Sequence, residues 1–63
     1  MNEELQSIVD SHTNGQMGQM IATISEMGEY EISNLIDLAV TCNQISLQTG
    51  FDILRKYMMY KKD

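Results

Sequence analysis

Asp10, Ser11 and His12 are adjacent in the chain and supply the three residue types of a hydrolase triad. A working triad brings its members to one point from separate structural elements. Neighbours on a helix instead point about 100° apart, because a turn takes 3.6 residues. His12 is also the one histidine of the chain. We therefore interpret these residues as surface groups near a helix end, and not as a catalytic set.

Cys42 is the one cysteine, so an intrachain disulfide is excluded. Reactive thiols sit beside cations, and no Lys or Arg precedes Cys42. Its place on an apolar helical stripe predicts a buried, unreactive thiol. One cysteine and one histidine also fall short of the four ligands of a structural zinc site. We expect no metal and no other cofactor.

Glu26, Glu29 and Glu31 could also be considered as metal ligands. On a helix, Glu26 and Glu29 share a face and Glu31 points away from it. We interpret the three as a solvated acidic patch. The stretch NGQMGQM, residues 14–20, lacks the spacing and the lysine of a phosphate-binding loop. We therefore expect no enzymatic activity.

The charges are distributed unevenly along the chain. The first 54 residues carry eight acidic side chains and no Lys or Arg, and the net charge is −5. Such a surface disfavours nonspecific nucleic-acid or membrane binding and suits a protein partner with a basic surface. The start of the chain is acidic, and the uncharged stretch 38–51 is too short and polar to span a bilayer. With a lone thiol, these features predict a cytoplasmic protein.

The elements that position these residues are expected to be helices, because the chain has no proline and four glycines. The first spans residues 2–11, with Asn2 as its cap. Residues 13–16 then form a turn whose Thr13 and Gln16 have capping-box spacing. The next apolar positions share one helical phase: Met17, Met20, Ile21, Ile24, Gly28, Ile32, Leu35, Ala39 and Cys42. This phase predicts one continuous helix over 16–42; the alternative is a break at Gly28.

The last helix is expected to start at Thr49, since Thr49 and Asp52 have capping-box spacing, and to run to about Lys61. Ser46 is the alternative cap. Asp52 should face Lys56 at i,i+4. The chain's four basic residues all fall in its last nine positions: Arg55, Lys56, Lys61 and Lys62. Cations near a helix C-terminus interact favourably with the helix dipole.

Two apolar stripes run along this last helix. One consists of Leu47, Phe51, Leu54 and Met58, and the neighbouring one of Ile53, Tyr57 and Tyr60. Together they span about 180°, wider than the arc of about 100° that a surface helix buries. We predict that Ile53, Tyr57 and Tyr60 are the surplus and contact another chain, since tyrosine is enriched at interfaces. The alternative is that the first helix folds back and covers them.

The sequence thus predicts a single all-α domain over 1–63, a small helical hairpin or three-helix bundle. A domain of this size is marginal alone, so we expect self-association, as a homodimer, to complete it. We expect a non-catalytic protein-interaction module, an acidic regulator or inhibitor of a larger protein, a profile shared by virus-encoded inhibitors. The candidate partner-binding residues are Ile53, Tyr57, Tyr60, Glu26, Glu29, Glu31 and Asp37.

Two other functions remain open. A helical hairpin could be the structural subunit of a homo-oligomeric assembly. Residues 35–58 also have the pattern of a DNA-binding helix-turn-helix, with Arg55 and Lys56 on the second helix. Recognition helices contact bases from their N-terminal residues. Here Asp52 lies among those residues, which makes DNA binding the weakest of the three.

Overall fold

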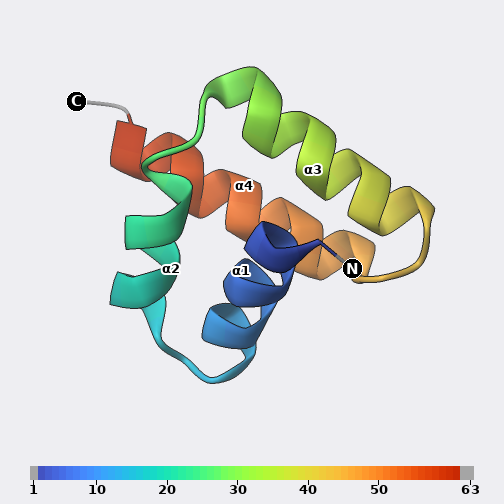
Figure 1. Ribbon diagram of the computed structural model, residues 1–63, viewed down its shortest axis with the longest axis horizontal. Helices are drawn as coiled ribbons and strands as arrows, with labels where there is room; N and C mark the ends of the chain where they lie inside the picture. Colours follow the sequence, from blue (N-terminus) through green and yellow to red (C-terminus); the bar gives the residue numbers. More distant parts are fainter. Residues whose placement is uncertain (1, 62–63) are drawn as a thin grey trace.

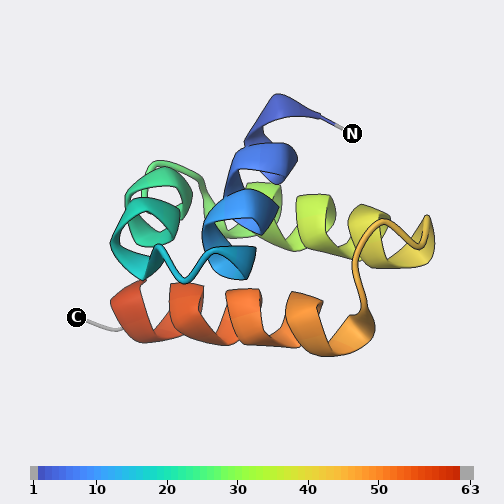
Figure 2. The same cartoon turned by 90° about the horizontal axis from the view of Figure 1, so that it is seen from below.

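The computed structural model describes residues 2–61, which form four helices and no strand: α1 (Glu3–Thr13), α2 (Met17–Ile24), α3 (Glu29–Thr41) and α4 (Leu47–Lys61). The all-α prediction is confirmed, with four helices in place of two or three. α3 and α4 run side by side in opposite directions (Figure 1). α4 lies along one side of the molecule, and the other three helices lie on its inner side (Figure 2).

Side-chain caps mark the starts of α1 and α4. The Leu5 backbone N–H donates to Asn2 Oδ1 at 2.9 Å, which confirms Asn2 as the cap of α1. At α4 the Thr49 N–H donates to Ser46 Oγ at 3.1 Å, so Ser46 is the cap and the predicted start at Thr49 is wrong. The predicted pairing of Thr13 with Gln16 is also absent, because Thr13 is the last residue of α1 and Gln16 makes no side-chain cap.

Two helices end on residues in the left-handed region. Gly15 follows α1 with φ 72°, and Asn43 follows α3 with φ 60°. After α3 the Gln44 N–H donates to the Ala39 carbonyl oxygen at 2.8 Å, the long hydrogen bond of a Schellman motif. Glycine and asparagine are the residues that tolerate this conformation best. Both turns therefore have a local origin in the sequence.

The prediction of one continuous helix over 16–42 is wrong, because α2 ends at Ile24 and α3 begins at Glu29. Gly28 has an extended backbone, with φ −75° and ψ 163°, and it caps α3. Its N–H donates to the Glu31 carboxylate at 3.4 Å. At 100° per residue, the buried residues of α2, Met20 and Ile24, and those of α3, Ile32, Ile36 and Ala39, centre about 100° apart, so the break also changes which face of the chain is buried.

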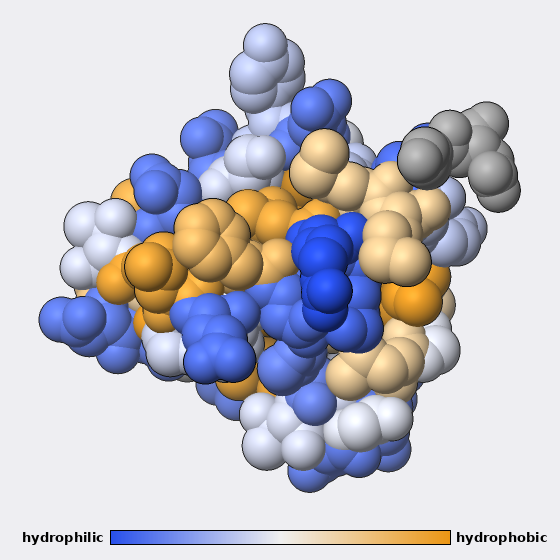
Figure 3. All heavy atoms as spheres, turned by 180° about the vertical axis from the view of Figure 1, so that it is seen from behind, coloured by the Kyte–Doolittle hydropathy of each residue, from blue (hydrophilic) through white to orange (hydrophobic). Residues whose placement is uncertain are grey.

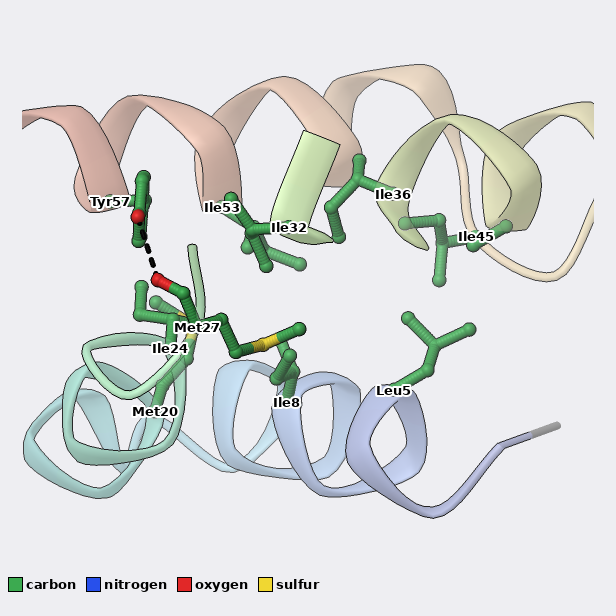
Figure 4. Packing of buried hydrophobic residues seen from close by; sticks show 11 residues of the cluster. Leu5, Ile8, Met20, Ile24, Met27, Ile32, Ile36, Ile45, Ile53 and Tyr57 are labelled. Carbon is green, nitrogen blue, oxygen red and sulfur yellow. Dashed lines mark hydrogen bonds between the residues drawn. The ribbon is translucent and has the colours of Figure 1, made fainter. Parts of the chain in front are cut away.

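The core draws on all four helices (Figure 4). Its buried apolar residues come from α1 and α2, the two turns after α2 and α3, and the inner faces of α3 and α4: Leu5, Ile8, Met20, Ile24, Met27, Ile32, Ile36, Ala39, Ile45, Ile53 and Tyr57. Met27 enters the core from the break between α2 and α3.

Candidate functional site

The inner face of α4 carries Ile53 and Tyr57, which are 0% and 4% exposed. The prediction that they form a free surface for another chain is therefore wrong, and Tyr60, 50% exposed, is the one member of that stripe with substantial access. Two contacts fix this orientation. The Tyr57 hydroxyl donates to the Met27 carbonyl oxygen at 2.8 Å. Gly50, one turn before Ile53, is buried against α3.

The stripe expected in the core is the exposed one. Leu47, Phe51 and Met58 are 59%, 64% and 67% exposed, and Leu54 is half-buried. We call these four residues the α4 seam. Figure 3 looks onto this side of the molecule and shows hydrophobic surface crossing it as a band among hydrophilic side chains. A contiguous apolar surface of this kind marks an interaction site more often than scattered single residues do.

Charged side chains border the α4 seam on both sides. Glu29 of α3 shares a shallow hollow with Phe51, Met58, Arg55 and Lys61. A second hollow, between α3 and α4, is lined by Ser33 and Asp37 together with Leu47, Phe51 and Leu54. The seam therefore lies in a mixed electrostatic environment, with carboxylates supplied by α3 and cations by α4.

The predicted acidic residues Glu26, Glu29, Glu31 and Asp37 are all exposed. Glu29 and Glu31 occupy the first turn of α3, where the helix dipole favours negative charge. Within residues 2–61 none of the four takes part in an ion pair. They are consequently available to cations of another molecule.

The outer face of α3 carries two large apolar side chains that the sequence reasoning missed. Tyr30 is 87% exposed and Leu38 is 61% exposed. At about 100° per residue they lie roughly 80° apart, with Asn34 between them and Glu31 about 20° beyond Leu38. We call Tyr30, Glu31, Asn34 and Leu38 the α3 outer face. Their position opposite the apolar stripe of the helix was the signal that could have identified them.

Asp52 holds the ion-pair cluster of the described chain. Its carboxylate accepts from Arg55 Nη2 at 2.7 Å and from Lys56 Nζ at 3.0 Å, and His12 Nε2 lies 2.7 Å away. The contact with Lys56 confirms the predicted i,i+4 pair. The hydrogen bonds from Arg55, His12 and Lys56 hold the pKa of Asp52 well below its usual range. The cluster joins α1 to α4 and engages both cations that the DNA-binding alternative requires.

Asp10, Ser11 and His12 do not converge in the structure. Ser11 is buried, the Asp10 carboxylate accepts from Gln6 Nε2 at 2.8 Å, and the His12 ring bonds Asp52. The expectation that all three are surface groups is wrong for Ser11. Cys42 caps the C-terminus of α3 and is exposed, which corrects the predicted burial of its thiol. The helix phase that placed it on the apolar stripe ends at Thr41.

Two further properties concern residues 2–61. No three His, Cys, Asp or Glu side chains among them group closely enough to hold a metal ion. None of their helices has the length and apolar character needed to cross a membrane. Comparisons of the chain with protein-family models, with curated proteins and with solved structures found no match.

Proposed function

We propose that this protein is a non-catalytic interaction module that binds a larger protein through the α3 outer face. The observation that carries the proposal is the exposure of Tyr30, 87%, which Glu29 and Glu31 flank in the sequence. Tyrosine contributes more than most residues to interface hot spots, because its ring buries a large area at low entropy cost. Leu38 extends the same face with a second apolar contact.

The charge around this face indicates the chemistry of the partner. Glu26, Glu29, Glu31 and Asp37 are exposed, and within residues 2–61 they pair with no cation. A basic protein surface would gain attraction over the whole group, and the attraction would also speed the encounter. The expected partner is therefore a protein with Lys or Arg around an apolar recess that accepts Tyr30. Occupying that basic surface is how the module would regulate or inhibit its partner.

Binding measurements test the proposal. The full chain, immobilised, is used to capture partners from the lysate of its source cells, and the purified partner is then titrated by calorimetry. Tyr30→Ala and Leu38→Ala should each weaken binding by about tenfold, as for a hot-spot contact worth about 1.4 kcal/mol. Glu31→Lys should also weaken binding, and by a larger factor at low salt than at high salt. Gln48→Ala, an exposed change on α4, is the matched control. Unchanged affinity in Tyr30→Ala and Leu38→Ala would reject the proposal.

One observation favours the alternative function as a structural subunit: α3 and α4 pair in antiparallel fashion as a helical hairpin. Such a hairpin can stack when its apolar outer surface meets a different surface of the next copy, which gives open-ended growth. Light scattering distinguishes the two functions. Particles that keep growing with concentration would favour the assembly, and a fixed mass favours the module.

A further inference from the structure

The spacing of the α4 seam is that of a coiled-coil helix. Leu47, Phe51, Leu54 and Met58 follow one another at i, i+4, i+7 and i+11, which is the alternation of d and a positions in a heptad repeat. A narrow seam with this spacing fits another helix laid along it. We propose that the occupant is the α4 seam of a second copy of this chain, which makes the protein a homodimer. The proposal is independent of the α3 outer face described above.

The exposure of the seam supports an interface along it. Phe51 and Met58 are 64% and 67% exposed, and Leu47 at the start of the helix is 59% exposed. A standard interface takes about 800 Å² from each partner, roughly a fifth of the 4310 Å² surface of this chain. A chain of 63 residues that leaves such a seam in water is short of buried apolar area. Dimerisation through the seam would supply that area.

The charges beside the seam select a second copy over a basic foreign helix. The copies carry a net charge of −5 each and repel one another over most of their surface. The seam is different, because Arg55 and Lys61 border it together with Glu29 and Asp37. A basic partner would meet these two cations, whereas a second copy brings both signs of charge.

The two signs of charge also lie so that two copies can match them. At about 100° per residue, Arg55 lies about 70° to one side of the seam and Gly50, which contacts α3, about 70° to the other. Asp37 and Glu29 are on the α3 side. A two-fold axis along the seam would place Arg55 of each copy, which also pairs with Asp52 of its own chain at 2.7 Å, over the acidic α3 side of the other. The two α4 helices would then run parallel.

The oligomeric state of the full chain tests the proposal. Light scattering from micromolar to millimolar concentration should give twice the chain mass of 7.2 kDa, with no further growth. Phe51→Glu and Met58→Glu should each halve the mass while the helical circular dichroism is retained. Leu38→Glu, at 61% exposure on α3, is the matched control and should stay dimeric. A wild-type mass of one chain at all concentrations, or equal loss of the dimer in Leu38→Glu, would overturn the proposal.

Disulfide trapping covers the case in which a charged variant unfolds. In a Cys42→Ser background, which removes the exposed native thiol, Phe51→Cys and Met58→Cys should each oxidise to a covalent dimer. Leu38→Cys should remain a monomer on the same gel. If neither seam cysteine cross-links, the seam is not an interface between copies. Partner binding through Tyr30 is measured separately and does not depend on that outcome.

Discussion

The hydroxyl of Tyr57 donates a 2.8 Å hydrogen bond to the carbonyl oxygen of Met27, and so joins α4 to the break between α2 and α3. Both groups are buried: Met27 is 3% exposed and Tyr57 is 4% exposed. A buried carbonyl group needs a partner, and the open turn at residues 25–28 leaves this one without a helical donor. The bond explains both why Tyr57 faces inward and how the break is tolerated.

Tyr57→Phe should lower the free energy of unfolding by about 1–2 kcal/mol. The substitution keeps the ring and leaves the Met27 carbonyl oxygen buried without a donor. Urea unfolding followed by circular dichroism measures the change. Tyr60→Phe is the matched control, since Tyr60 is 50% exposed, and it should shift the free energy by less than about 0.5 kcal/mol. Equal effects of the two substitutions would mean that the bond to Met27 contributes nothing.

The sequence predicted some of the features that local chemistry decides. Asn2 as the first cap and the pairing of Asp52 with Lys56 both depend on residues within one helical turn. The inward face of α4 could not be predicted this way. The outer stripe is the more apolar of the two, and the inward face is set by contacts between distant parts of the chain, among them the bond from Tyr57 to Met27, 30 residues away. Periodicity carries no information about such a distant acceptor.

The partner-binding surface predicted on α4 was wrong for the same reason. The two stripes of α4 have the opposite orientation to the predicted one: Ile53 and Tyr57 are buried, and Phe51 and Met58 are exposed. The acidic residues could be predicted as exposed, because isolated carboxylates are costly to bury. The break at Gly28 was the alternative and not the prediction, because the apolar residues on its two sides share one helical phase in the sequence, although Glu29 and Glu31 gave the start signal of a new helix.

Gly50→Ala should destabilise the fold, although alanine favours a helix. A Cβ at residue 50 would meet Val40 Cγ2 at 2.9 Å and Ile36 Cγ2 at 3.1 Å. Both are branched side chains with little rotamer freedom. Overpacking of about 1–3 kcal/mol should exceed the helix-propensity gain of about 1 kcal/mol.

Gly18→Ala is the matched control for that substitution. A Cβ at residue 18 in α2 meets nothing within 4 Å, so the variant should gain up to about 1 kcal/mol from helix propensity. Thermal unfolding of both variants and of wild type shows directly whether each substitution raises or lowers the stability. Stabilisation by Gly50→Ala would contradict the close packing of α4 against α3.

Asp52 should make the stability of the protein depend on pH in the acid range. Its hydrogen bonds, from Arg55 first and then from His12 and Lys56, lower the pKa of the folded state below the ordinary value of 3.8. The unfolded chain therefore takes up the proton first as the pH falls. The stabilisation is fully present above pH 3.8 and is lost progressively toward the lower pKa of the folded state.

Asp52→Asn should remove the part of the pH dependence of stability that comes from Asp52. The variant should lose less unfolding free energy than wild type between about pH 7 and about pH 2.5, measured by urea unfolding. Asp10→Asn serves as control, because Asp10 accepts from Gln6 and makes no ion pair within residues 2–61. If the unfolding free energy of Asp52→Asn falls with pH as steeply as that of wild type, the cluster around Asp52 does not form in solution.

The α4 seam is free only because α4 packs with Ile53 and Tyr57 inward, so the most direct measurement compares the two faces of this helix. Ile53→Ala should cost about 2–4 kcal/mol of unfolding free energy, because a fully buried Ile53 leaves a cavity. Phe51→Ala, measured at low protein concentration to separate folding from dimerisation, should cost less than about 1 kcal/mol at 64% exposure. The reverse order, with Phe51→Ala the more damaging change, would show that α4 faces the other way and would remove the basis for the dimer.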